Sequence, residues 1–346
     1  MKALYSQSKN GQVITEIREV PDPTPRDGEV KVKVEYSSLN YKDALAVTSV
    51  GSIFKKFPII GGIDVAGEIV ETRSSKFKVG DPVLVTGCGL GETHDGGYAK
   101  FVIELDQNVV LRNSQGDEAT ALTSRQAMIF GTAGFTAELA LARMLQNGQK
   151  PEMGPVLVTG ASGGVGQFAI RAFSRAGFEV HALTGKPEVH ERLTKLGAKK
   201  IVRSDEFWSM SAAPDSSTRS VRPLESVQYG GAVDNLGGKT LAAIIARTQL
   251  WGSVASIGLA ENAELHTTVM PMVLRGVSLL GISSNNCAYD LRLKLWRKLA
   301  AEAANNQREM FDLDTFVTRE ISLDQVLDVA KAMLSRQTYG RILVKI

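Results

Sequence analysis

The chain has 346 residues, of which 43% are hydrophobic and 22% are charged, and its net charge is +3. These values fit a globular protein with room for two domains, and they argue against a nucleic-acid partner. We expect no membrane span and no signal peptide, because no apolar run has the required length. Cys88 and Cys287, the two cysteines, lie far apart in the sequence, which favours a reducing compartment, the cytoplasm.

The first part of the chain has the pattern of short strands. Hydrophobic residues alternate along 11–17 and 29–35, and further strands are expected at 64–71, 82–86 and 99–103. Turn residues separate these segments. We therefore expect a small, irregular β-barrel domain over residues 1–125.

From residue 126 the pattern changes to alternating strands and helices. After a helix at 135–145, strands are expected at 155–159, 178–183, 200–203, 229–234 and 252–257, with helices at 164–176, 188–196 and 240–247. This alternation predicts an α/β domain with a parallel, doubly wound sheet. We assign it to residues 126–307, with a surface loop insertion at 209–223.

The last part of the chain, residues 308–346, returns to the style of the first domain. A strand is expected at 316–321, a helix at 324–333 and a final strand at 341–345. The α/β domain is therefore interpreted as an insertion into the β-rich domain.

The most informative motif is the glycine-rich turn between the strand at 155–159 and the following helix. It reads Ala161-x-Gly163-x-x-Gly166, with Gly160 and Gly164 added. In a βαβ unit such a turn directs backbone N–H groups and the positive end of a helix at one point, which suits a pyrophosphate. We predict a dinucleotide site here, the alternative being a plain structural turn.

The end of the next strand favours NADPH over NADH. NAD-specific sites place a carboxylate about 20 residues after the glycines to bind the ribose 2′-hydroxyl. Here the strand ends in Thr184-Gly185-Lys186, and Lys199 and Lys200 lie at the next corner. A hydroxyl and ammonium groups suit a 2′-phosphate. The alternative is that these lysines are solvated surface residues.

Several segments resemble the medium-chain dehydrogenase/reductase superfamily in its zinc-free, quinone-oxidoreductase-like division. They cover essentially the whole chain and include residues 38–44, 62–70, 79–83, 158–166, 196–198 and 233–238. Residues 40–43, 267–276 and 340–344 are similar to the acrylyl-CoA reductase (NADPH) branch. The resemblance implies a GroES-like β-barrel catalytic domain, a Rossmann domain that binds NADPH, and a homodimer.

The zinc ligands of metal-dependent relatives have no counterpart in this sequence. Their Gly-His-Glu triplet reads Gly62-Ile63-Asp64 here, and another ligand position falls within Asn40-Tyr41. Zinc needs three or four Cys, His or carboxylate ligands at defined spacing, which Cys88 and His94 alone do not supply. We therefore expect no metal.

Without a metal, the expected reaction is the reduction of an activated C=C bond or of a quinone. Negative charge then develops on a substrate oxygen, which calls for a hydrogen-bond donor. Tyr41 is the candidate donor, also placed near the nicotinamide, and Asn40 is the candidate for orienting the substrate or the cofactor ribose. The alternatives are an aromatic residue that fixes a loop and an amide that satisfies its own backbone.

The resemblance implies further cofactor contacts along the chain. At the pyrophosphate these are Ser162, Gly163, Gly164 and Val165, and at the adenosine phosphate they are Thr184, Gly185, Lys186 and Lys200. Leu250, Ile257 and Ser284 are expected near the nicotinamide half, and Arg341 is expected to reach the cofactor from the last strand. Leu250 and Ile257 could equally be core residues.

The expected function is the NADPH-dependent reduction of a short 2-enoyl thioester, such as acrylyl-CoA to propanoyl-CoA. A broad quinone or enone reductase on the same scaffold is the first alternative. A non-enzymatic NADPH-binding protein is the second. The expected partners are a small-molecule substrate and a second copy of the chain, with neither a nucleic acid nor a membrane.

Overall fold

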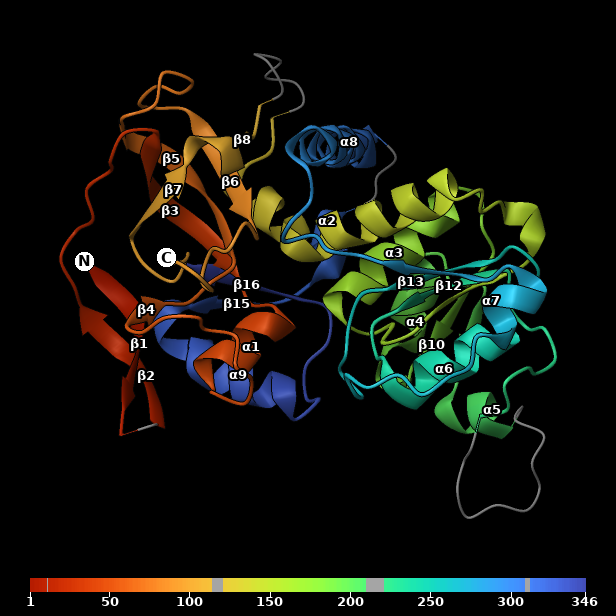
Figure 1. Ribbon diagram of the computed structural model, residues 1–346. Coiled ribbons are helices and arrows are strands. Elements are labelled where there is room, and N and C mark those ends of the chain that lie inside the picture. The colour runs from red at the N-terminus through yellow and green to blue at the C-terminus, as the bar shows by residue number, and fades with distance from the viewer. Residues whose placement is uncertain (11, 114–120, 210–220, 309–311) are drawn as a thin grey trace. The chain divides into compact units, whose positions relative to one another are not determined.

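The computed structural model describes the chain except for residues 11, 114–120, 210–220 and 309–311 (Figure 1). The chain forms two compact units, Met1–Phe135 with Ser284–Ile346 and Thr136–Ser283. The boundaries expected at 125/126 and 307/308 thus lie elsewhere, because helix α2 (Ser124–Gln146) continues from the first unit into the second and α8 (Tyr289–Arg308) belongs to the first. Most of the insertion expected at 209–223 lies outside the described residues.

The first unit is built on two β-sheets (Figure 1). The larger sheet has the order β15 (Val317–Ser322), β16 (Arg341–Lys345), β3 (Glu29–Ser38), β5 (Asp64–Thr72), β6 (Pro82–Thr86) and β8 (Val110–Leu111), and β7 (Phe101–Leu105) also pairs with β3. The smaller has the order β2 (Gln12–Glu19), β1 (Lys2–Lys9) and β4 (Ile59–Ile60). Alternation places Val30, Val32 and Val34 of β3 in one buried core.

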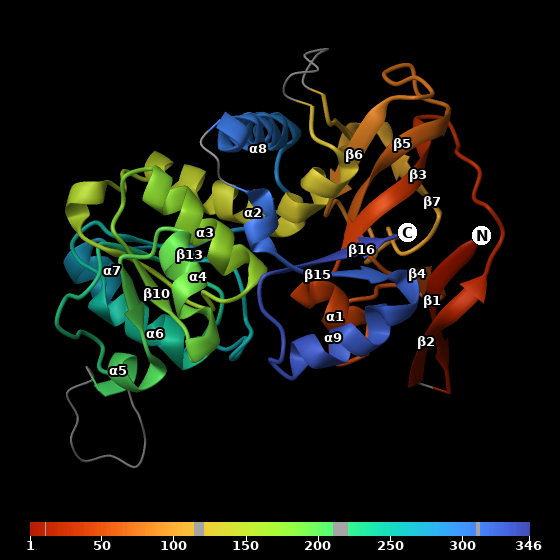
Figure 2. The ribbon, with the colours of Figure 1, turned by 180° about the vertical axis from the view of Figure 1, so that it is seen from behind.

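A second core of this unit lies under two short helices. Helices α1 (Tyr41–Val47) and α9 (Val326–Leu334) pack against each other, as Figures 1 and 2 both show. Ala44 and Val47 of α1 share this core with Val326 and Ala330. The pairing joins segments from opposite ends of the chain, so β16 and α9 complete the unit that begins at Met1.

The second unit carries a six-stranded parallel sheet. Its order is β11 (Lys200–Val202), β10 (Val180–Leu183), β9 (Val156–Val158), β12 (Gly231–Asp234), β13 (Ser253–Ser256) and β14 (Ser278–Gly281). The strand order reverses between β9 and β12, as in dinucleotide-binding folds. The doubly wound sheet predicted from the sequence is confirmed.

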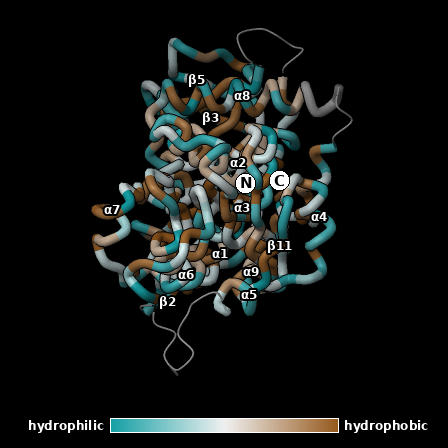
Figure 3. The backbone as a smooth tube through the Cα atoms, turned by 90° about the vertical axis from the view of Figure 1, so that its right-hand side faces the viewer, coloured by the Kyte–Doolittle hydropathy of each residue, from teal (hydrophilic) through white to brown (hydrophobic). Residues whose placement is uncertain are grey.

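The helices of this unit are α3 (Gly164–Arg175), α4 (His190–Lys195), α5 (Ser204–Ser209), α6 (Gly238–Arg247) and α7 (Met270–Arg275). Helix α7 is hydrophobic and lies at the periphery of the unit (Figure 3), with Val273 and Leu274 exposed. The sequence predicted α3 and α6 but not α7, nor β14, α1 and α8. These missed segments are short, except α8, in which charged residues interrupt the apolar ones.

Helix α2 departs from the expectation that no segment could span a membrane. By length and composition it meets the requirement, and 78% of its most apolar window is buried inside the protein. It also breaks at Gly131, where φ is 49° and ψ is −156°. Buried apolar helices of this kind are found in protein cores as well as in membranes.

Candidate active site

The glycine-rich turn after β9 has the geometry of a phosphate-binding loop. The strand ends at Val158 and α3 begins at Gly164, with Gly160 at a φ of +55° between them. A Cβ on Gly166 would lie 2.5 Å from the Gly160 carbonyl oxygen and 2.7 Å from Ala161 Cα. Only glycine at 166 therefore lets the first turn of α3 pack this closely on the loop.

Two helices begin at the same edge of the sheet, and their N-termini differ in charge. In α6 the Glu261 carboxylate accepts a hydrogen bond from the Thr240 N–H at 3.0 Å. In the described part of the chain, no side chain accepts from the N–H groups of 164–166 at the start of α3. Because a helix N-terminus is partially positive, Glu261 neutralises α6 and leaves α3 as the end suited to an anion.

A side chain that the sequence analysis did not select holds the shape of the glycine loop. Gln167, in the first turn of α3, is fully buried and donates from Nε2 to the Ser162 carbonyl at 2.9 Å. This bond fixes the turn that carries Ser162, Gly163, Gly164 and Val165. The signal in the sequence is one polar residue on an otherwise apolar helix face.

A buried carboxylate ties the glycine loop to the neighbouring strand. Asp234, the last residue of β12, accepts from Thr159 Oγ1 at 2.7 Å and from the Gly237 N–H at 2.8 Å. Burial raises the pKa of Asp234 to about 6. The network spans the point where the strand order reverses, which is where ligands bind in this fold. In the sequence, Asp234 lies in a segment that resembles the family, and no local pattern marks it as part of the site.

The end of β10 presents the three residues expected to recognise an adenosine phosphate. Thr184 Oγ1 accepts from the Lys186 N–H at 3.1 Å, so the hydroxyl shapes the turn that carries Gly185 and Lys186. Partial burial lowers the pKa of Lys186. Lys200 is the first residue of β11, where it pairs with His181 of β10. Its ammonium forms a 2.6 Å ion pair with Glu206. The structure therefore groups Thr184, Gly185 and Lys186, while Lys200 already has a carboxylate partner.

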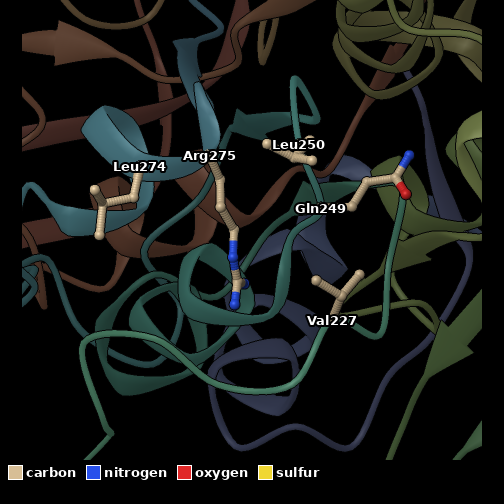
Figure 4. A pocket seen from close by; sticks show the side chains of 5 residues that line it. All are labelled: Val227, Gln249, Leu250, Leu274 and Arg275. Atoms are coloured by element: carbon tan, nitrogen blue, oxygen red, sulfur yellow. The ribbon is translucent and has the colours of Figure 1, made fainter.

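Ile257 and Leu250 lie at opposite edges of the parallel sheet. Ile257 follows β13 and donates its N–H to the Asp234 carbonyl at 2.9 Å, at the edge where the glycine loop lies. Leu250 precedes β13 and therefore lies at the other edge. There it is 62% exposed and lines a pocket with Val227, Gln249, Leu274 and Arg275 (Figure 4). Within the second unit, the structure thus separates Leu250 from Ile257 and from the glycine loop.

In the first unit, Asn40 is held by two oppositely charged side chains. Its Oδ1 accepts from Arg341 Nη1 at 2.9 Å, and its Nδ2 donates to Asp64 Oδ2 at 2.9 Å. Arg341 and Asp64 are 2% and 0% exposed, and their nearest charged atoms lie 3.9 Å apart. The Asn40 side chain therefore bonds to side chains from β16 and β5.

The same ion pair closes the break in α2. Arg341 donates to the Met128 and Ile129 carbonyls at 3.0 and 2.8 Å, where the first half of the helix ends. Asp64 accepts from the Thr132 N–H, where the second half begins. The positive Arg341 thus stabilises the negative C-terminal end of one helix half, and the negative Asp64 stabilises the positive N-terminal end of the other. Arg341 is directed inward with all three guanidinium nitrogens engaged, so we do not assign it the cofactor contact expected from the sequence.

Tyr41 and Ser284 complete the set of expected residues in the first unit. Tyr41 is the first residue of α1 and is 40% exposed, next to the half-buried Asn40. Ser284 accepts a hydrogen bond from Arg292 Nη2 through its carbonyl at 2.8 Å. The structure therefore makes Tyr41 accessible to a ligand and gives the Ser284 backbone a structural partner.

The loop at 87–97 is held by ion pairs. Lys42, next to Tyr41, pairs with Glu92, and His94 Nε2 lies 3.0 Å from Glu104 Oε2. The hydrogen bond to Glu104 raises the pKa of His94. Over the described residues, no group of three or more His, Cys, Asp and Glu side chains is placed to hold a metal ion.

Comparison with known proteins gives full-length relatives. Residues 26–146 match the alcohol dehydrogenase GroES-like domain. The acrylyl-CoA reductase AcuI of Ruegeria pomeroyi is 40% identical over 320 residues, which are 92% of this chain and 90% of that protein.

Solved structures agree over the entire length. The yhdH oxidoreductase from Salmonella enterica, in complex with NADP, is 38% identical, with a TM-score of 0.88 and 100% of both chains covered. The Bacillus subtilis protein yhfP with NAD bound is 37% identical, with a TM-score of 0.87, and covers 100% of this chain and 99% of that one. The GroES-like domain and the Rossmann-type domain expected from the sequence are therefore both confirmed.

Proposed function

Because this chain belongs to the medium-chain dehydrogenase/reductase superfamily, in its quinone-oxidoreductase-like division, we propose that it uses NADPH to reduce a short 2-enoyl thioester such as acrylyl-CoA. The chain is an oxidoreductase, and NADPH is its cofactor. The identity of the substrate is the proposal. The relative named an acrylyl-CoA reductase, 40% identical over nearly the whole chain, supports it.

The observation that carries the cofactor assignment is the uncapped start of α3. The N–H groups of 164–166 and the helix dipole suit the pyrophosphate, and Thr184, Gly185 and Lys186 suit the 2′-phosphate. When bound, NADPH supplies a hydride to the β-carbon of the enoyl group. We propose that Ser162, Gly163, Gly164 and Val165 hold the pyrophosphate and that Ile257 lies toward the nicotinamide half.

Tyr41 is the proposed hydrogen-bond donor to the thioester oxygen, on which negative charge develops. Its phenol is accessible, and its position is set by Asn40 at the N-cap of α1. A proton must also reach the α-carbon, and a phenol or a water next to it can deliver one. Asn40 is a positioning residue in this scheme, because its amide is engaged by Arg341 and Asp64.

A substrate panel tests the proposal. NADPH oxidation is followed spectroscopically with acrylyl-CoA, crotonyl-CoA, benzoquinones and simple enones, and the product of the first is identified as propanoyl-CoA. Efficient turnover of the thioesters supports the proposal. Turnover of quinones or enones alone would establish the broad reductase instead. NADPH binding without reduction of any acceptor would favour the non-enzymatic alternative.

We further propose that the reaction needs no metal, that the enzyme works as a homodimer, and that it acts in the cytoplasm. Dialysis against a chelator should leave turnover unchanged, because the Gly62-Ile63-Asp64 segment uses Asp64 to cap α2 instead of binding zinc. Light scattering on the purified protein measures the mass of the assembly. A monomer at working concentrations would contradict the dimer.

A further inference from the structure

Two carboxylates and one guanidinium are buried together around Asn40. Asp43, Asp64 and Arg341 are 1%, 0% and 2% exposed. Asp43 Oδ2 accepts from the Asn40 backbone N–H at 2.9 Å and from its Nδ2 at 3.1 Å. With Asp64 on Nδ2 and Arg341 on Oδ1, every polar atom at the N-cap of α1 except the Asn40 carbonyl is held by one of these three charges.

The charges in this cluster do not balance. Two carboxylates face a single guanidinium, and two like charges in a buried site cannot both ionise freely. The titratable groups that face Asp43 are Asp64 from β5, Arg341 from β16 and Tyr98, which precedes β7. Tyr98 is fully buried, its hydroxyl donates to the Ser38 carbonyl at 3.0 Å, and its pKa is raised well above the usual value. It therefore stays neutral and adds no counter-charge.

Asp43 is the member of the cluster that takes up a proton. Its burial, and then the charge of Asp64, raise its pKa to about 7. The ionised carboxylate accepts from three N–H groups, because Oδ1 also accepts from the Ile63 N–H at 2.9 Å. A protonated oxygen loses acceptor capacity, so protonation weakens at least one of these three bonds.

We propose that Asp43 is a positioning residue whose ionised form holds Asn40 and the start of α1, so that protonation of Asp43 releases Tyr41 from its working position. The link to Tyr41 is covalent and short, because Asn40 is the N-cap and Tyr41 is the first residue of the helix. The expected effect on turnover rests on the function proposed above. Turnover should fall as the pH drops through about 7, because the proton is taken up on the low-pH side.

The matched variant is Asp43→Asn, which has the shape of the protonated carboxyl. We expect wild-type kcat to fall about tenfold from pH 8 to pH 5.5, and Asp43→Asn to be low and flat over that range, at the wild-type value for pH 5.5. NADPH affinity should change less than kcat in the variant. Asp64→Asn should move the wild-type midpoint to lower pH, because it removes the neighbouring negative charge.

The control is Asp328→Asn, a carboxylate on α9 with an 85% exposed side chain, which should leave the pH profile unchanged. A wild-type profile that is flat, or an Asp43→Asn profile with the wild-type inflection, would overturn the proposal. Loss of the inflection in the control would also overturn it, since the inflection would then not belong to Asp43.

A second measurement does not depend on activity or on a foldable variant. Infrared titration of the wild-type protein, with aspartate labelled in its side-chain carboxyl with ¹³C, should show a protonated-carboxyl band that disappears as the pH rises through about 7, in addition to the band of Asp234, which disappears through about 6. Absence of such a band would overturn the titration itself. If the band is present and no acceptor in the substrate panel is reduced, the proposed function is wrong, but the titration of the buried Asp43 is supported.

Discussion

The glycine loop of the second unit and the Asn40 cluster of the first unit both place polar groups at the start of a helix. The two sites differ in whether protein side chains bind those polar groups. At the loop, Gly166 packs on Gly160 and the N–H groups of 164–166 meet no side-chain acceptor among the described residues. At Asn40, both side-chain polar atoms have charged protein partners. The first arrangement is prepared to bind an anion, and the second to hold a neighbouring side chain still.

The largest effect is expected where the charges are most deeply buried. Arg341→Met should lower the free energy of unfolding by about 3–5 kcal/mol, because it strands the buried Asp64 and leaves the Met128 and Ile129 carbonyls without their donor. Chemical denaturation measures the loss. Arg341→Lys keeps the charge but not the fork of donors, so it should cost less. Equal stability of Arg341→Met and wild type would show that the cluster is not structural.

The next largest effect is expected at the open site. Gly166→Ala places a Cβ against backbone atoms of Gly160 and Ala161, so the loop must shift. NADPH affinity should fall about 100-fold, which corresponds to about 2.7 kcal/mol, as measured by fluorescence titration. Gly281→Ala is the matched control, because nothing lies within 4 Å of its Cβ position. Comparable losses in both variants would remove the special role of the loop.

A smaller loss of NADPH affinity is expected when one lysine, which distinguishes NADPH from NADH, is removed. Lys186→Ala should weaken NADPH about tenfold and leave NADH nearly unchanged, because only NADPH carries the 2′-phosphate. Lys200→Ala should have less effect, since Lys200 already pairs with Glu206. Lys195→Ala, on the exposed side of α4, serves as the control. A similar loss for NADPH and NADH would refute the phosphate contact.

The smallest effect is expected when only one hydroxyl is removed. Tyr41→Phe should lower kcat about fivefold, which is about 1 kcal/mol of transition-state stabilisation, without changing NADPH affinity. Steady-state kinetics with the best acceptor of the panel, together with a cofactor titration, separate the two effects. Tyr5→Phe, in β1 of the smaller sheet, is the control. Unchanged turnover in Tyr41→Phe would exclude the phenol as the donor.

The sequence predicted the second unit better than the first. The strand at 155–159, the glycine turn and the helix at 164–176 are close to the observed β9 and α3. Their signal is local, since an apolar strand, a glycine turn and an amphipathic helix follow each other directly. Leu250 was expected near the nicotinamide, but it precedes β13 and so lies at the other edge of the sheet. A shift of a few residues along the chain is enough to move a residue from one edge to the other.

The sequence by itself determined the alternation of strands and helices, the glycine loop and the absence of a carboxylate at the tip of the second strand, because each is carried by residues adjacent in the chain. Only the tertiary structure decided that Arg341 points inward, that Asp64 restarts α2 after Gly131, and that Asp43 shares one counter-charge with Asp64. These partners lie up to 301 positions apart, as for Asn40 and Arg341. Burial and charge balance arise only when the fold brings such residues together, so no local pattern announces them.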